Sequence, residues 1–308
     1  RSIMEQILKL KPVLKDYIWG GHKLETLYGR NNGGQPVSES WEVSVHPDGL
    51  TTYEGGTFAD YVAAHPYALD KEGSSFPILI KYIDAAQNLS VQVHPTDDYA
   101  RLMEGDNGKT EMWYVVQADE GAGIYCGFKE EITESEFMRA LKEGNVEKLL
   151  NFISVKAGDC YLIPAGTVHA ICAGCVIFEV QQSSNVTYRV YDYGRRDTNG
   201  KQRPLHIDKA LDVICFQKFK DKTHGAGYVN IGKSKVRKLT ACPYFSCREL
   251  KLDDAYEEMN TNSFTCINII SGIGQIDGRK FRSGDCYFVP RNIKFRISGE
   301  ATVILTTK

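Results

Sequence analysis

Residues that could hold a metal ion are concentrated in the first two thirds of the chain. Gln92 and His94 alternate in the run 90–94, so in an extended strand both side chains would point to the same face. Glu111 opens the next β-rich run, and His169 follows a Gly-Thr-Val turn. Two imidazoles, a carboxylate and an amide oxygen form a mixed nitrogen and oxygen site for a divalent transition metal, with room for water or substrate. We therefore predict that these four residues are metal ligands.

Each of these residues also has an ordinary structural interpretation. A lone histidine such as His94 in an apolar strand is usually a hydrogen-bonded core residue, and Gln92 alone would more often be a polar residue of a sheet. Lys109 follows a glycine in a turn-like segment, where a solvated lysine is common. The motif Cys172–Cys175 resembles half of a metal or redox site, but it is a single CxxC, so a turn with two free thiols is favoured.

The elements that must position these ligands are indicated by an internal repeat. Residues 157–164 and 283–290 align without a gap at a separation of 126 residues. Each copy is a Gly-Asp turn followed by a short β-rich run that ends in proline. Short strands in two similar halves are typical of jelly-roll barrels. Opposite His169 the second copy has Phe295, so the barrel itself does not require the ligands.

Helical periodicity interrupts this β pattern in only a few places. It predicts helices over residues 57–69, 133–152 and 207–219. Thr133 and Glu136 have the spacing of a capping box at the start of the second helix. The composition of residues 218–236 predicts a break between the barrels. We therefore predict two domains, a catalytic metal-binding barrel with a helical insertion (1–225) and a degenerate second barrel (226–308).

Composition excludes several classes of protein. Lys plus Arg number 37 against 39 Asp plus Glu, and a net charge of -2 provides no general attraction for nucleic acid. No stretch reaches the roughly 20 apolar residues that cross a bilayer, and the first residues lack the apolar run of a signal peptide. Nine cysteines, an odd number, favour reduced thiols and a cytoplasmic location. The sequence leaves open whether residues 1–3, which precede the first methionine, are native.

Several motifs together resemble those of the type I mannose-6-phosphate isomerases, also called phosphomannose isomerases, of the cupin superfamily. The resemblance covers nearly the whole chain and is closest to the short bacterial form. The motifs are Tyr17-Ile-Trp-Gly-Gly21, Glu39-Ser-Trp-Glu42, Gln92-Val-His-Pro95, Lys109-Thr-Glu111, Pro164-Ala-Gly-Thr-Val-His169 and the segment from Glu179 to Arg189. The resemblance implies an all-β double cupin, that is, two jelly-roll barrels with a few inserted helices.

The resemblance also implies a reaction and a cofactor. It implies that Gln92, His94, Glu111 and His169 hold one zinc ion per chain, and that Arg189 is the family's active-site arginine. The implied reaction interconverts mannose 6-phosphate and fructose 6-phosphate by moving a proton between C2 and C1 through an enediolate. Zinc would polarise the sugar oxygens as a Lewis acid.

Three charged residues are the candidates for catalysis. Arg189 stays protonated at working pH, so we assign it to charge stabilisation of the enediolate or of the phosphate rather than to proton transfer. Lys109 has the reach to steer the substrate. Glu179 lies on the opposite strand face from its apolar neighbours and, if it points into the cavity, is a candidate base. Lys109, and His94 acting through bound water, are the alternatives.

Other functions are compatible with the same residues. A non-catalytic sugar-binding or regulatory double cupin would use a metal only to organise a pocket. Another metal cupin enzyme would act on a different sugar phosphate or on oxygen, although oxygen chemistry favours iron in a simpler ligand set. Longer family members usually carry Ser-Asp-Asn before the arginine, whereas this chain reads Ser-Asn-Val-Thr-Tyr around Asn185, a departure near the substrate. Monomer and homodimer both remain open.

Overall fold

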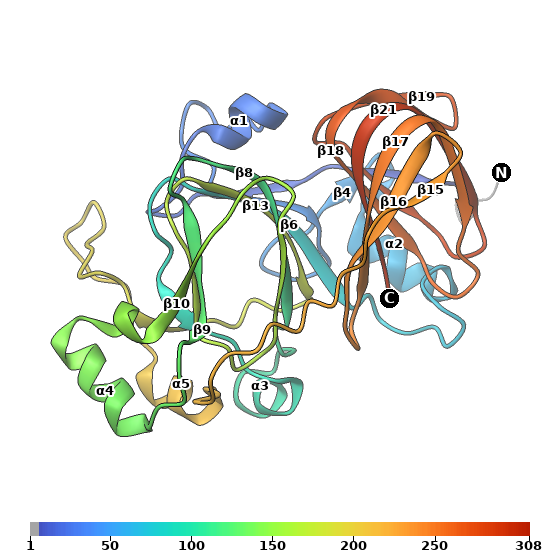
Figure 1. Cartoon of the computed structure of the whole chain (residues 1–308). Coiled ribbons are helices and arrows are strands. Elements are labelled where there is room, and N and C mark those ends of the chain that lie inside the picture. Colours follow the sequence, from blue (N-terminus) through green and yellow to red (C-terminus); the bar gives the residue numbers. More distant parts are fainter. Residues whose placement is uncertain (1–5) are drawn as a thin grey trace.

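The computed structural model describes residues 6–308 and divides them between two β-rich halves that lie side by side (Figure 1). Residues 1–5 begin the predicted domain 1–225, and the question of whether residues 1–3 are native lies outside the described residues. Strands dominate both halves and helices are few. The predicted all-β fold of two jelly-roll barrels with inserted helices is therefore confirmed.

The first half is a sandwich of two antiparallel sheets. The six-stranded sheet has the order β11 (Cys160–Ile163), β8 (Glu111–Ala118), β13 (Cys175–Gln182), β6 (Ile78–Ala85), β3 (Glu39–Val43) and β2 (Val13–Lys15). The five-stranded sheet has the order β10 (Leu150–Ser154), β9 (Gly123–Phe128), β12 (His169–Ile171), β7 (Val91–Val93) and β14 (Tyr188–Tyr191). A separate two-stranded sheet joins β4 (Thr52–Tyr53) to β5 (Gly56–Thr57).

Alternate residues of the central strand β13 face two different cores. Val176, Phe178 and Val180 belong to a cluster of buried apolar residues that continues into the second half. Ile177 belongs to the cluster inside the first barrel. Because side chains alternate along a strand, Glu179 points to the same inner face as Ile177. The sheet is thus buried on both sides, and its inner face carries charge.

The second half is one eight-stranded sheet that curls around its own core. Its main path is β1 (Leu8–Leu10), β20 (Cys286–Val289), β18 (Thr265–Ile276), β21 (Lys294–Thr307), β17 (Ser246–Met259), β16 (Ser234–Ala241) and β15 (Val229–Ile231), and β19 (Arg279–Arg282) pairs with β18. Strand β1 lies within the predicted domain 1–225 but pairs with β20. From β1 in the second sheet the chain crosses to the first barrel and later returns, and the boundary at 225 stays a prediction.

Three long strands of the second half bend at one level. Asp254 of β17 pairs with Gly299 of β21, and Gly272 of β18 lies opposite Ala301. The φ angles of Asp254, Gly272 and Gly299 are 75°, 109° and 130°. A Cβ atom on Gly299 would lie 2.4 Å from the carbonyl oxygen of Ile273, so only glycine fits there. These positions let single strands contribute to both walls of the barrel.

The repeated turns of the two halves have the same hydrogen bonds. Gly158 donates its N–H to the Val115 carbonyl at 2.8 Å, and Gly284 donates to the Ile269 carbonyl at 2.8 Å. The φ angles of the two glycines are 90° and 91°. Strands β11 and β20, which follow these turns, keep the separation of 126 residues. The sequence repeat is therefore a structural repeat.

Each half also donates an arginine to the repeated turn of the other half. Arg30, bound to the buried Glu42 at 3.0 Å, donates to the Gly284 carbonyl at 2.6 Å. Arg237, bound to Glu249 at 3.1 Å, donates to the Gly158 carbonyl at 2.7 Å. With the shared apolar cluster between the sheets, these reciprocal contacts hold the two halves together.

The helices lie between strands and cover mainly the first half (Figure 1). They are α1 (Lys23–Tyr28), α2 (Phe58–Ala64), α3 (Asp97–Glu104), α4 (Glu134–Glu143) and α5 (Ile207–Val213), with 3-10 turns η2 (Pro66–Ala68) and η3 (Val146–Leu149). The predicted capping box of Thr133 and Glu136 is confirmed at the start of α4.

The predicted helix boundaries are partly wrong. The helix predicted over 133–152 ends at Gly144, whose φ of 69° is left-handed, and its last residues begin strand β10 instead. The helix predicted over 207–219 ends at Val213. The prediction did not include α1 or α3. Short helices carry too few periodic residues to be separated from loops by pattern alone.

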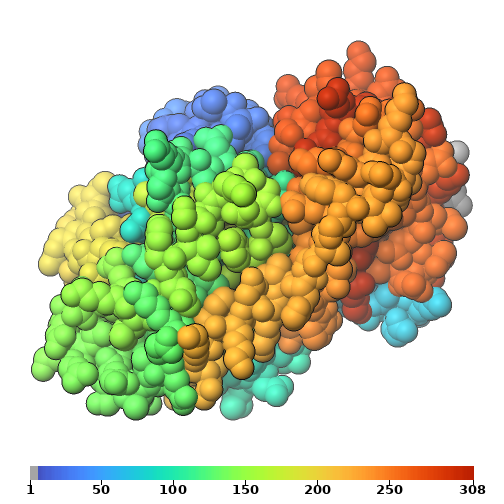
Figure 2. All heavy atoms as spheres, viewed as in Figure 1, coloured from blue at the N-terminus to red at the C-terminus, as the bar shows by residue number. Residues whose placement is uncertain are grey.

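Residues 214–228 connect the halves without a helix or strand, apart from one isolated bridge at Lys218. In Figure 2 this segment, coloured orange, runs across the surface from the first half to the second. None of the helices within residues 6–308 is long and apolar enough to cross a membrane. All nine cysteines are free thiols, and six of them are buried.

Candidate metal centre and active-site pocket

The four predicted ligands come from three strands and meet inside the first barrel. Glu111 places Oε1 3.2 Å from His169 Nε2 and Oε2 3.4 Å from His94 Nε2. Gln92 Nε2 lies 3.5 Å from His169 Nε2. The ligand atoms of His94, Glu111 and His169 all lie within 4.8 Å of one another, and all three residues are buried. The structure therefore brings the predicted ligands together around one point.

The two imidazoles are oriented by backbone carbonyl groups. His94 Nδ1 donates to the Val186 carbonyl at 2.9 Å, and His169 Nδ1 donates to the Thr167 carbonyl at 2.8 Å. A proton on each Nδ1 leaves the Nε2 lone pairs directed at Glu111. Burial and the neighbouring Lys109 lower the pKa of His94 to about 3, so this imidazole is neutral at pH 7. Neutral imidazoles held in this tautomer are the form that binds divalent metal ions.

Gln92 fits the same donor set through its amide group. Its Oε1 accepts a hydrogen bond from the Ser90 hydroxyl at 3.2 Å, and its Nε2 faces His169. A half-turn of the amide exchanges these atoms and points the oxygen at His169 Nε2. Two nitrogens and two oxygens suit a divalent metal such as zinc.

Lys109 joins Glu111 to Glu179. Its ammonium donates to Glu111 Oε2 at 2.9 Å and lies 3.6 Å from Glu179 Oε1. Burial alone would lower the pKa of Lys109, but the two carboxylates raise it above its usual value. Burial and the charge of Glu111 raise the pKa of Glu179 well above its usual range. Two of the three predicted catalytic residues, Lys109 and Glu179, therefore lie beside the ligands.

A second lysine and carboxylate extend this row of charges across the six-stranded sheet. Lys81 of β6 pairs in register with Glu179 of β13. Its ammonium donates to Glu39 Oε2 at 3.2 Å. The inner face of the sheet thus alternates carboxylate and ammonium groups from β3 to β8. Sequence reasoning missed Lys81 and Glu39, although a lysine within the apolar run 78–83 is a detectable signal.

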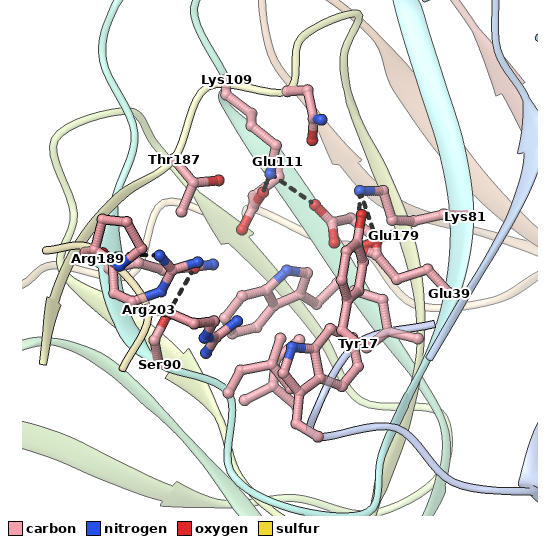
Figure 3. Close-up of a pocket in the computed structure, with 18 residues that line it drawn as sticks. Tyr17, Glu39, Lys81, Ser90, Lys109, Glu111, Glu179, Thr187, Arg189 and Arg203 are labelled. Carbon is pink, nitrogen blue, oxygen red and sulfur yellow. Dashed lines mark hydrogen bonds and ion pairs between the residues drawn. The ribbon is translucent and has the colours of Figure 1, made fainter. Parts of the chain in front are cut away.

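These residues line a cavity of about 470 Å³ that opens beside the ligands Gln92 and Glu111. Figure 3 shows Glu39, Lys81 and Glu179 on one side of it, and Arg189 and Arg203 across from them. The aromatic residues of the lining are Tyr17, Trp19 and Trp113. The pocket therefore has a metal-ligand wall, a wall of paired charges and a cationic end.

Arg189 lies at the cationic end and is not paired with any carboxylate of residues 6–308. Its Nη1 donates to the Pro204 carbonyl at 2.9 Å, and its buried Nε has no hydrogen-bond partner among these residues. Asp192 instead binds Arg195 and Arg203, and Asp197 accepts from backbone N–H groups. The guanidinium is therefore free to bind an anion in the pocket.

The second barrel has no such site at the equivalent positions. Phe295 lies in the second core, where the repeat aligns it with His169. Thr265 pairs with β20 as Glu111 pairs with β11. The metal-binding groups thus occur in only one copy of the fold, as the sequence predicted. Within residues 6–308 the three-residue cluster of the first barrel is the single group with metal-binding spacing.

The Cys172–Cys175 motif lies away from the ligand cluster, in the turn between β12 and β13. Burial raises the pKa of the Cys172 and Cys175 thiols, to about 12 and about 11. Thiols with such pKa values are poor nucleophiles and poor metal ligands at pH 7. The motif is therefore a turn with two free thiols, as predicted.

Comparisons with known proteins agree with this geometry. Residues 7–130 match the family model of the catalytic domain of type I phosphomannose isomerase. A probable mannose-6-phosphate isomerase of Bacillus subtilis (strain 168) is 35% identical over 315 residues, covering 98% of this chain and 99% of the relative. The mannose-6-phosphate isomerase of Streptococcus mutans is 34% identical over 312 residues and 98% of both chains.

The fold matches solved structures over almost the whole chain. The crystal structure of the mannose 6-phosphate isomerase from Bacillus subtilis superposes with a TM-score of 0.91 and 31% identity, covering 98% of this chain and 99% of that one. A mannose 6-phosphate isomerase bound with zinc and yttrium superposes with a TM-score of 0.76 at 18% identity, over 98% and 99% of the two chains. At that identity the second match shows the shared fold alone.

Proposed function

Because this chain belongs to the type I phosphomannose isomerase family, we propose that it interconverts mannose 6-phosphate and fructose 6-phosphate, with the residue roles given below. One observation carries the proposal. Three buried ligand residues form one cluster, with both imidazoles oriented by carbonyl groups, and one of the three, Glu111, lines a pocket that also contains paired lysines and carboxylates and a cationic end. A metal, a proton-transfer group and an anion-binding group are what an aldose-ketose isomerase of a sugar phosphate needs.

The proposed metal is one zinc ion per chain, held by Gln92, His94, Glu111 and His169. The nitrogen and oxygen donors and their separations support a divalent ion of this size. When bound, zinc supplies Lewis acidity to the oxygens on C1 and C2 of the sugar.

We assign proton transfer between C2 and C1 to Glu179. Its Oε1 is buried and has no hydrogen-bond partner within the described residues 6–308, and the residue lines the pocket. A carboxylate whose pKa is raised by burial is a stronger base than one in water. Glu179 would take the proton from C2 of the open-chain aldose and return it to C1. Lys109, 3.6 Å away, would assist the matching transfer of a proton from O2 to O1.

Arg189 has an electrostatic role in this proposal. Its guanidinium stays charged, so it neither gives nor takes a proton. With one hydrogen bond to a carbonyl and an unpartnered Nε, it can stabilise negative charge on the enediolate or on the phosphate. His94 acting through bound water is the less favoured base, because its Nε2 is directed at the metal ligands.

A sugar-binding or regulatory protein is the alternative from a different class. Such a protein would need the pocket but not Lys109, Glu179 and Arg189 together around it. A metal cupin acting on another sugar phosphate would keep all of them. The location in the cell and the choice between monomer and homodimer stay predictions.

A coupled assay for fructose 6-phosphate formed from mannose 6-phosphate tests the proposal. We expect turnover by the zinc-loaded protein, loss of turnover with a chelator, and recovery when zinc is restored. Turnover of a different aldose phosphate at a higher kcat/KM would support an enzyme that acts on another sugar phosphate. If the metal-loaded protein binds sugar phosphates but turns none of them over, the sugar-binding alternative is supported.

A further inference from the structure

Three arginines gather near one end of the pocket around a single carboxylate. Asp192 is buried and accepts from Arg195 at 2.6 Å and from Arg203 at 2.7 Å. Arg189, the third, has no carboxylate partner in the part of the chain that the structure describes. One negative charge therefore faces three positive charges. The excess is local, since the chain as a whole has a net charge of -2.

Arg203 is held so that part of its guanidinium group remains available. Its Nε and Nη2 donate to the two oxygens of Asp192 at 2.9 Å and 2.7 Å. Its Nη1 has no partner among residues 6–308 that satisfies hydrogen-bond geometry, and the residue lines the pocket. Figure 3 shows Arg203 and Arg189 on the same side of the pocket. Two guanidinium groups thus border one space.

The other cations of the pocket are already neutralised. Lys81 binds Glu39 at 3.2 Å, and Lys109 binds Glu111 at 2.9 Å. A phosphate placed there would have to compete with a carboxylate. At the arginine end it would instead relieve the repulsion between like charges, which together with burial lowers the pKa of Arg189. A dianion is therefore favoured at the arginine end alone.

We propose that Arg203, held in place by Asp192, selects phosphorylated sugars by binding the substrate phosphate together with Arg189. Arginine donates to phosphate through a planar fork, and the bond is charge-assisted. This inference rests on the proposed function for the identity of the sugar. It assigns a specificity role to Arg203 and a positioning role to Asp192, neither of which contacts the metal ligands.

Inorganic phosphate is the probe that tests the inference without turnover. We would titrate it by calorimetry into the zinc-loaded protein and into the chelator-treated protein. Arg203→Met should weaken phosphate binding by about 10- to 100-fold in both forms, as expected for loss of a charge-assisted bond. Arg196→Met is the matched control, since Arg196 is an arginine of the same loop that donates only to the Gly200 carbonyl. It should bind phosphate as the parent protein does.

Steady-state kinetics separate specificity from catalysis. Arg203→Met should raise KM for mannose 6-phosphate by a similar factor and change kcat by less than about threefold. Arg203→Lys keeps the positive charge but loses the planar fork of donors. Its KM for mannose 6-phosphate should therefore lie between those of the parent protein and of Arg203→Met. Thermal melting of each variant establishes that it is folded.

Three results would overturn the inference. The first is unchanged phosphate affinity in a folded Arg203→Met protein. The second is phosphate binding that disappears with the metal but not with Arg203, which would place the anion on zinc. The third is a loss of kcat rather than a rise in KM. If the parent protein binds phosphate through Arg203 but isomerises no sugar phosphate, the proposed function fails while the anion site stands.

Discussion

Arg189→Ala should separate activity from stability, and the structure allows both effects to be estimated. Inside the chain the Arg189 side chain makes one hydrogen bond, to the Pro204 carbonyl. Such a bond contributes about 0.5–1.5 kcal/mol to stability. At about 2.1 cal/mol/K per residue, 308 residues give an unfolding entropy near 0.65 kcal/mol/K. The melting temperature should therefore fall by only about 1–2 °C.

The same substitution should strongly reduce activity. Removing one preorganised donor to a developing negative charge typically lowers the rate by about 10²- to 10³-fold. We therefore expect kcat/KM for mannose 6-phosphate to fall by that factor in the coupled assay. Metal content after gel filtration should stay at the parental value, because within residues 6–308 no hydrogen bond or ion pair joins the Arg189 guanidinium to a ligand side chain.

Arg195→Ala is the contrasting variant. Arg195 donates to Asp192 at 2.6 Å and to the Asn88 carbonyl, and it is not part of the pocket lining. Loss of a bond to a charged group should cost about 1.5–3 kcal/mol of stability, and activity should fall less than in Arg189→Ala. The reasoning is wrong if Arg189→Ala loses its metal, or if it is destabilised more than Arg195→Ala while keeping most of its activity.

Three further outcomes are expected. His169→Ala should lose metal and activity together, as measured by metal analysis after dialysis; full metal content would contradict the ligand assignment. Arg30→Met should lower the free energy of unfolding by about 3–5 kcal/mol because it leaves Glu42 buried and unpaired. Adding Glu42→Gln to this variant should recover part of the lost stability in denaturant titrations. If it recovers none, the loss does not come from an unpaired Glu42. Asp192→Asn tests how the stability of the protein depends on pH. Burial opposes ionisation of Asp192, but Arg203 and Arg195 lower its pKa. The stability it adds should be fully present above about pH 5 and decline as pH falls through its lowered folded-state pKa. If the difference in the free energy of unfolding between the parent and Asp192→Asn grows below pH 4, this expectation is wrong.

Local patterns in the sequence predicted much of the candidate site. Gln92 and His94 share a face because strand side chains alternate, and Glu179 faces inward for the same reason. The duplicated turn indicated the two barrels, and the absence of ligands in the second copy indicated which barrel could bind metal. These inferences needed only residue spacing and a comparison of the chain with itself.

Other features could not be read from local pattern. Residues 150–152 are the end of the helix predicted over 133–152, yet they belong to β10 and pair with β9 because a partner strand is available there. Strand β1 joins the second sheet across more than 270 residues of sequence. The reciprocal contacts of Arg30 and Arg237 depend on how the two halves pack, which no stretch of either half encodes.

The sequence by itself determined the repeat, the faces of the strands and the types of group available for chemistry, because these depend on neighbours one or two residues away. Tertiary structure decided which charges meet. Arg203 reaches the pocket only because Asp192 is buried beside it, and Lys81 meets Glu39 and Glu179 only because three strands are adjacent. Such contacts join residues far apart in the chain, and their energies depend on burial that exists only in the folded protein.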